Sequence, residues 1–309
     1  MLLRMADSNI NPRRDSMIRI PSLRQPLNPA PMGSPEQLKA FITAHQRLLV
    51  ITGAGLSTGS GIPAYRNHSG DWLRRTPIFY QDFMRSSTAR RRYWARSYIG
   101  WQPVARAAPN PGHYALANLE RSGHIDTLIT QNVDGLHQRA GSQSLIELHG
   151  QLGRVRCLDC GQVYRRDDIQ TRLSELNPGW LPEVYQLNPD GDVDLDDAAY
   201  PGFNVADCQN CHGRLKPDVV FFGESVCPQV SRSIQQASDH CDGVLVVGSS
   251  LVVMSGYRIV KSMHGQKKPV VAINQGHTRA DDLLEFKVNQ DCVKVLDHLQ
   301  NSLEETGAF

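Results

Sequence analysis

The stretch that most constrains the fold is an apolar run that ends in a glycine turn. Residues 48–51 read Leu-Leu-Val-Ile, and Gly53-Ala54-Gly55 follows after one threonine. A β-branched strand that runs into such a turn is typical of an α/β protein, in which glycines let backbone N–H groups approach a phosphate. The third glycine of the dinucleotide fingerprint would fall where this chain has Thr58. The segment therefore predicts a nucleotide site, but not an ordinary dehydrogenase fingerprint.

Three further apolar runs have the length of buried strands: residues 125–130, 243–248 and 269–273. Short continuous runs of this kind are typical of a parallel sheet that is covered on both faces. Each of the four runs is followed directly by glycine or polar residues: Gly53, Gln131, Ser249-Ser250 and Asn274-Gln275. Ligands of open α/β sheets bind beyond the carboxyl ends of the strands, so we expect these clusters to meet in one crevice. The predicted fold class is α/β, with a Rossmann-like parallel sheet.

The domain boundaries follow from changes in composition along the chain. Ser34, Pro35 and Gln37 form the pattern of a helix start, with a cap, a proline in the first turn and a capping box. Residues 1–33 show little periodicity, so we expect a flexible N-terminal tail. Residues 34–152 and 215–309 are expected to form the main domain, with a small helical insertion at about residues 72–110. Residues 153–214 are expected to form a separate module.

Four of the seven cysteines form two Cys-x-x-Cys pairs, Cys157 with Cys160 and Cys208 with Cys211. Two residues between cysteines let both sulfurs reach one ion, and four thiolates suit tetrahedral zinc. The odd number of cysteines and the lack of a secretory leader argue against a disulfide framework. Because no histidine or carboxylate replaces a thiolate, the predicted zinc is structural.

The centre of the cysteine module, residues 183–197, carries six acidic side chains and no basic one. Asp190, Asp192 and Asp194 alternate as calcium ligands do, but the twelve-residue spacing and the final Glu of a calcium loop are missing. We therefore expect a solvated insertion in the zinc module and no calcium site.

Composition argues against several classes of partner. The 309 residues carry a net charge of +2 at pH 7, which gives no case for nucleic acid or a membrane surface as the main partner. No apolar run approaches the roughly 20 residues that span a bilayer. The first 33 residues fit a tail, favoured by Asp7 and Asp15, or an arginine-containing transit peptide. We expect a cytoplasmic location, with the mitochondrial matrix as the alternative.

The glycine turn continues through Ser57, Pro63, Tyr65 and Arg66, and residues 51–66 resemble the NAD-binding segment of the sirtuins, the NAD-dependent protein deacylases. Further similar segments follow in the family's order: residues 130–137, 147–150, 216–224, 248–250, 274–276 and Cys292. The resemblance spans about residues 35–295. Each segment alone is only suggestive, but their shared order makes the resemblance specific.

The resemblance implies an enzyme that consumes NAD to remove acetyl, longer or acidic acyl groups from lysine side chains of proteins. In the sirtuins the acyl oxygen attacks the nicotinamide ribose, nicotinamide departs, a histidine draws a proton from a ribose hydroxyl, and O-acyl-ADP-ribose is released. The matching position is His149, whose imidazole suits proton transfer near neutral pH. His137 is expected to pack against the crevice wall.

The same resemblance assigns the NAD contacts. The glycine turn and Ser57 should cradle phosphates, Gln131 should hold ribose, and Asn132 and Asp134 should line the nicotinamide pocket, Asn132 also counting as catalytic. Ser249 and Asn274 should hold the adenosine half, with Cys292 at the adenine. The implied cofactor-binding set is Gly53, Ala54, Gly55, Ser57, Pro63, Tyr65, Arg66, Gln131, Asn132, Asp134, Gly248, Ser249, Ser250, Asn274, Gln275, Gly276 and Cys292.

Residues 216–224 are similar to the sirtuin strand that takes up the acylated peptide, with Val219, Phe221 and Gly223 as the expected contacts. An extended peptide that pairs with an exposed strand edge gains affinity with little demand on its sequence. Within the family, the chain is most similar in sequence to the mitochondrial sirtuin 4 branch, class II. The similar segments are Arg92-Tyr93-Trp-Ala-Arg96, residues 216–223 and residues 255–258.

Tyr93 and Arg96 match the Tyr-x-x-Arg pair with which the desuccinylase branch holds acyl chains that end in a carboxylate. Positions i and i+3 share a helix face, and arginine binds a carboxylate through two hydrogen bonds. The alternative is a surface helix in an arginine-rich lobe.

Two other functions stay open, a protein mono-ADP-ribosyltransferase and an NAD-sensing adaptor with weak catalysis. A hydride-transferring dehydrogenase is disfavoured, because Thr58 breaks the fingerprint and no ribose-binding acid is evident. The expected partners are NAD, one structural zinc ion and acylated lysines of proteins, with no nucleic acid and no membrane. The oligomeric state is left open.

Overall fold

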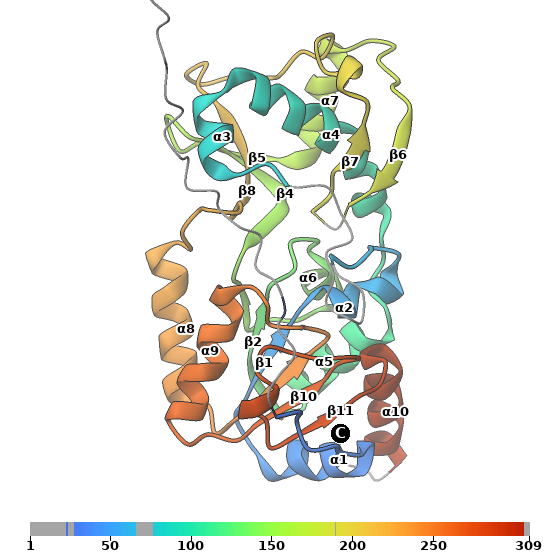
Figure 1. The fold of residues 1–309 in the computed structure, drawn as a ribbon, viewed down its shortest axis with the longest axis vertical. Helices are drawn as coiled ribbons and strands as arrows, with labels where there is room; N and C mark the ends of the chain where they lie inside the picture. Colours follow the sequence, from blue (N-terminus) through green and yellow to red (C-terminus); the bar gives the residue numbers. More distant parts are fainter. Residues whose placement is uncertain (1–22, 24–27, 66–76, 189, 306–309) are drawn as a thin grey trace, which may run out of the picture.

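The computed structural model describes residues 23, 28–65, 77–188 and 190–305. Arg66, one of the predicted NAD contacts, lies outside the described residues. The chain forms a larger part around a parallel sheet and a smaller part of short strands and helices (Figure 1). Within the described residues, no helix has both the length and the apolar character needed to cross a membrane.

The larger sheet has six parallel strands in the order β11-β10-β9-β1-β2-β3. The strands are β1 (Leu48–Thr52), β2 (Ile125–Thr130), β3 (Leu145–Glu147), β9 (Gly243–Val247), β10 (Val270–Ile273) and β11 (Phe286–Val288). The predicted α/β class is confirmed, and the four apolar runs are strands. The short strands β3 and β11 were not predicted.

Helices cover both faces of this sheet (Figure 1). On one face lie α1 (Pro35–Ala44), α5 (Pro111–Arg121) and α10 (Cys292–Glu305), and on the other α8 (Pro228–His240) and α9 (Met254–Gly265). Leu48 and Val50 of β1 pack into the first core, whereas Leu49 and Ile51 pack into the second. The run is continuously apolar because both faces of the strand are buried.

The sheet domain includes residues that precede the predicted helix start. Helix α1 has the predicted capping box, in which Ser34 accepts from the backbone N–H of Gln37 and the Gln37 side chain accepts from that of Ser34. However, Ala30 is buried, and Met32 forms a parallel bridge with Lys287. Residues 30–33, which were assigned to the tail, therefore pack along the outer edge of β11 and belong to the sheet domain.

The smaller part combines the helical insertion and the cysteine module in one core. Its elements are α3 (Tyr80–Arg85), α4 (Ser87–Arg106), α7 (Arg166–Leu176) and an antiparallel sheet in the order β5 (Val163–Arg165), β4 (Gly150–Cys157), β8 (Leu215–Val219). Phe83 and Trp94 of the insertion pack with Ile169 and Leu173 of the module and with Leu215 of β8. Two segments that are separate in the sequence thus fold together.

The acidic segment contains a hairpin of β6 (Val184–Leu187) and β7 (Val193–Leu195). Asp192 and Asp194 are only 3% and 7% exposed, so the predicted solvated insertion is wrong for this part of the hairpin. Arg96 of α4 supplies the opposing charge, with Nη2 2.9 Å from Asp192 Oδ2 and 3.3 Å from Asp194 Oδ1. Carboxylates are buried in proteins when they are paired in this way.

Candidate active site

A cavity of about 860 Å³ lies beyond the carboxyl ends of β1, β2, β9 and β10, next to the smaller part. Its volume is in the range of small-molecule and cofactor sites. The structure brings most of the predicted residues to its wall: Gly53, Ala54, Gly55, Tyr65, Tyr93, Gln131, Asn132, His149, Val219, Phe221, Gly223, Gly248, Ser249, Ser250, Asn274, Gln275 and Cys292.

Five of the described residues that were predicted to contact NAD or the substrate do not line this cavity. Ser57 and Asp134 line a small adjoining pocket, whose wall also includes Asn132. Pro63, Gly276 and Arg96 line neither of these two cavities.

The glycine turn is required by the close approach of β9. A Cβ atom at Gly53 or Gly55 would lie 2.9 or 2.8 Å from the carbonyl oxygen of Gly248. The N–H of Gly55 donates to that same oxygen over 2.8 Å, and Gly248 itself has a φ of +58°. This contact seats the short helix α2 (Ala54–Ser57) against the end of β9 and leaves the backbone of the turn along the cavity wall.

Asn132 ties the loop after β2 to the glycine turn. Its Nδ2 donates to Gly53 O and to Ser57 Oγ, over 3.0 Å in each case. Ser57 in turn donates to Asp134 Oδ2 over 2.7 Å. Burial raises the pKa of Asp134, and the hydrogen bond from Ser57 opposes that rise. Three polar residues from two strand ends thus form one hydrogen-bonded unit.

His149 lies immediately before β4, with both ring nitrogens engaged. Nδ1 is 2.9 Å from the carbonyl oxygen of Gln131, and Nε2 is 2.8 Å from Ser255 Oγ. A carbonyl only accepts, so Nδ1 carries the proton and Nε2 of the neutral ring is the acceptor. Burial lowers the pKa of His149, against the raising effect of the Gln131 bond. The ring is therefore neutral near pH 7 and able to take up a proton at Nε2.

His137, unlike His149, does not lie at the cavity wall. Its Nε2 is 2.9 Å from Thr52 Oγ1, and its side chain is 1% exposed. Burial lowers the pKa of His137 to about 3, with a smaller contribution from His113.

The far end of the cavity is formed by the ends of β9 and β10 and the start of α10. Ser249 Oγ accepts from Gln131 Nε2 over 2.8 Å, and Asn274 Nδ2 donates to Gln275 O over 2.8 Å. Cys292, the first residue of α10, is 5% exposed and lies in the cavity wall.

The segment that follows β8 runs beside His149. The N–H of Val220 donates to His149 O over 2.8 Å, and Val219, Phe221 and Gly223 line the cavity. In its three-stranded sheet β8 pairs only with β4, so the other side of β8 has no strand neighbour among the described residues. An extended peptide could add to this edge next to the histidine.

Tyr93 and Arg96 are placed differently from one another. Tyr93 lines the cavity near Asp190 and Asp192, and burial raises its pKa. Arg96 is 4% exposed, donates to Val193 O over 2.9 Å and pairs with the carboxylates of the hairpin. The expected clamp for an acyl carboxylate is not formed here, because the guanidinium already holds carboxylates of the chain itself.

The cavity wall also contains residues for which the sequence indicated no role: Thr58, Asp190, Asp192, Ser255, Arg258 and His277. The alternation of Asp190 and Asp192 was visible, but it resembled a calcium loop. Residues 255–258 were noticed only because their sequence is similar to that of one branch of a family. Nothing in the sequence linked Ser255 to His149.

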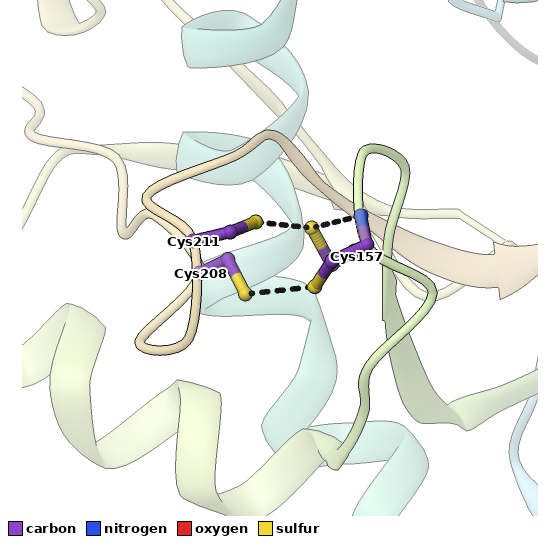
Figure 2. A group of neighbouring side chains, drawn as sticks. Cys157, Cys208 and Cys211 are labelled. Carbon is purple, nitrogen blue, oxygen red and sulfur yellow. Dashed lines mark hydrogen bonds between the residues drawn. The ribbon is translucent and has the colours of Figure 1, made fainter.

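The four paired cysteines form one cluster. Their sulfur atoms all lie within 4.8 Å of one another, and Figure 2 shows Cys157, Cys208 and Cys211 pointing toward one another. The distances are 3.6 Å between Cys157 and Cys211 and 3.7 Å between Cys160 and Cys208. Four sulfurs about 2.3 Å from a central zinc would be separated by about 3.8 Å, so the cluster fits tetrahedral zinc.

Comparison with known proteins gives the family. Residues 53–255 match the Sir2 family. A Bradyrhizobium diazoefficiens protein named NAD-dependent protein deacetylase 2 is 48% identical over 267 residues, which are 86% of this chain and 97% of its own. A Bos taurus protein named NAD-dependent protein lipoamidase sirtuin-4, mitochondrial, is 48% identical over 274 residues, 87% of either chain.

Solved structures agree. A Sir2–p53 peptide–NAD⁺ complex has a TM-score of 0.70 at 28% identity and covers 90% of this chain and 100% of its own. A complex of NAD with a Sir2 homologue has a TM-score of 0.71 at 28% identity, with 90% and 97% covered. The predicted likeness to the sirtuin 4 branch is confirmed, and bacterial deacetylases match equally well. Similar in sequence and in fold over most of its length, this chain belongs to the Sir2 family, the sirtuins.

Proposed function

We infer that the chain is an NAD-dependent protein-lysine deacylase. The observation that carries this function is the position of His149, whose Nε2 is at the wall of a cavity shared by the glycine turn and the segment after β8. One side of this cavity suits a dinucleotide and the other suits an extended peptide. The names of the relatives, NAD-dependent deacetylase and lipoamidase, support the same chemistry.

The donor set of the cavity fits NAD. Gly53, Ala54 and Gly55 line the cavity where the phosphates would bind, and Ser249 and Asn274 offer polar groups to the adenosine half. The N–H groups of Gly53 and Gly55 donate to Val247 O and Gly248 O, so the N–H of Ala54 would be the main donor of the turn to a phosphate. When bound, NAD would supply a ribose carbon for attack by the acyl oxygen as nicotinamide leaves, and a ribose hydroxyl to which the acyl group passes. Asn132, which donates to Gly53 O, would hold the loop beside the nicotinamide ribose, and His149 would take a proton at Nε2 from the hydroxyl that becomes the acyl acceptor.

We propose that the acyl-lysine reaches this point between the edge of β8 and Tyr93. Val219, Phe221 and Gly223 would contact the peptide, and the ring of Tyr93 would line the acyl channel. The four cysteines would hold a structural zinc ion that fixes the loops at the end of β4 and before β8. Because bacterial proteins are among the relatives, we propose a cytoplasmic location over the mitochondrial matrix, which cell fractionation tests.

Product analysis distinguishes the candidate functions. The protein is incubated with NAD and with peptides that carry acetyl-, succinyl-, glutaryl- or lipoyl-lysine, and nicotinamide and acyl-ADP-ribose are measured by mass spectrometry. We expect both products in equal amounts. ADP-ribose attached to protein, without formation of acyl-ADP-ribose, would point to mono-ADP-ribosyl transfer. The absence of both products would point to an NAD-sensing adaptor.

Arg96→Met should lower stability and reduce turnover of all acyl substrates alike. The change leaves Asp192 and Asp194 buried without their opposing charge, and breaking a buried pair typically costs about 3–5 kcal/mol. Thermal unfolding and turnover of acetyl- and succinyl-lysine peptides test this. The matched control is Arg92→Met, because Arg92 pairs with Asp197 at the surface, where ion pairs contribute little. A loss confined to succinyl-lysine at unchanged Tm would show instead that Arg96 serves the acyl carboxylate.

A further inference from the structure

The hydroxyl of Ser255 occupies the only acceptor position of the neutral His149 ring. With Nδ1 donating to Gln131 O, the single lone pair of the ring is at Nε2, and Ser255 Oγ lies 2.8 Å from it. Ser255 is in the first turn of α9 and lines the cavity. A serine hydroxyl therefore stands where a base of this kind would meet the hydroxyl of its substrate.

The first turn of α9 is fitted closely against Gln131. A Cβ atom at Gly256 would lie 2.7 Å from Oε1 and 2.9 Å from Cδ of Gln131. The Gln131 side chain is itself held, because its Nε2 donates to Ser249 Oγ and to Thr52 O. Gln131 thus acts on both ring nitrogens of His149. Its carbonyl accepts from Nδ1, and its side chain supports the turn that carries Ser255, the partner of Nε2.

We propose that Ser255 is a positioning residue of the deacylase, which holds the ring of His149 in the ligand-free enzyme and yields Nε2 to the substrate hydroxyl on binding. This inference rests on the proposed function. Since Nε2 accepts one hydrogen bond, the two hydroxyls cannot both donate to it in full. Before binding, the serine keeps the Nδ1–H tautomer and the orientation of the ring. After binding, the substrate hydroxyl takes its place.

The charge state of the ring gives this proposal a measurable consequence. A hydroxyl that donates to Nε2 stabilises neutral imidazole and disfavours imidazolium, so its removal raises the pKa of His149. The other charged or titratable groups that line the same cavity are Tyr65, Tyr93, Asp190, Asp192, Glu224, Arg258, His277, Asp291 and Cys292. Within the described residues, the hydrogen bonds of the His149 ring go to Gln131 and Ser255, and no ion pair includes His149.

The first experiment follows the His149 ring by NMR titration of the ligand-free protein, with the resonance assigned from His149→Ala. Ser255→Ala should raise the pKa of His149 by about 0.4–1 unit, the equivalent of one hydrogen bond. Ser255→Thr, which keeps the hydroxyl, should restore the parent value. Ser262→Ala, which removes an exposed hydroxyl further along α9, is the control. An unchanged titration in Ser255→Ala would overturn the proposal without any reference to activity.

The second experiment compares two pH profiles. The profile of kcat/KM reports groups of the free enzyme, and that of kcat reports groups of the substrate complex. Ser255→Ala should shift the acid limb of kcat/KM to higher pH by the same amount and leave the acid limb of kcat in place. A shift in both profiles, or in neither, would overturn displacement of the serine by substrate. If the parent protein formed no acyl-ADP-ribose, the proposed function would fail, while the NMR titration would still decide the role of Ser255.

Discussion

His149→Ala should slow the formation of acyl-ADP-ribose by about 10²–10⁴-fold, the usual effect of removing a general base. The substitution deletes Nε2 from the cavity wall and leaves the glycine turn, Asn132 and the far end of the cavity unchanged. NAD binding should therefore persist, because its proposed phosphate and adenosine contacts come from other residues. The loss should be in kcat more than in KM for NAD.

Steady-state turnover and calorimetric NAD titration check this result. His264→Ala is the control, because His264 is exposed near the end of α9 and away from the cavity. Near-parental turnover of His149→Ala would remove this histidine from the mechanism. Loss of NAD binding together with loss of the fold, seen by circular dichroism, would mean that the ring is needed for structure.

Cys208→Ser should remove zinc and destabilise the smaller part of the molecule. Cys208 is 1% exposed and packs in the same core as Trp94 and Phe203. Structural zinc contributes on the order of 10–16 kcal/mol to the folding of small zinc peptides. In domains of about 150–250 residues, each kcal/mol of lost stability lowers Tm by about 2–4 °C. The loss of zinc should therefore give a clearly measurable decrease in Tm.

Metal analysis and thermal unfolding test the assignment. The parent protein should contain one zinc ion per chain, held by the four-cysteine cluster. Cys227→Ser is the matched control, because Cys227 is an exposed cysteine outside that cluster. A parent protein without zinc, or an unchanged Tm in Cys208→Ser, would refute the assignment.

The parts of the fold that the sequence predicted are those in which one local pattern determines the outcome. β1 and β9 are buried on both faces, so they are continuously apolar and can be recognised without knowledge of their neighbours. β3 and β11 have three residues each, and the sequence of β11, Phe-Lys-Val, includes a lysine. Lys287 is buried in the structure because its ammonium pairs with Asp281 over 2.7 Å. A pairing of that kind is decided by tertiary contacts.

The site likewise contains some features that local sequence determines and others that tertiary contacts determine. The glycine turn and the two cysteine pairs are local motifs, and the structure places each beside a cavity or in a cluster. The burial of Asp192 and Asp194 depends on Arg96, which lies on a helix far away in the sequence. A run of acidic residues normally indicates a solvated surface, and here a distant guanidinium supplies the charge that allows the carboxylates to be buried. The contact between Ser255 and His149 is likewise set by the packing of α9 on Gln131.

The ladder of β4 and β8 joins the metal site to the reaction centre. Cys157 pairs with Leu215 at one end, and Gly150, next to His149, pairs with Val219 at the other. A bound peptide would become the next strand of this same ladder. Compounds that extract zinc should therefore inhibit the enzyme without competing with NAD. The cysteine cluster thus offers a route to inhibition that does not pass through the nucleotide pocket.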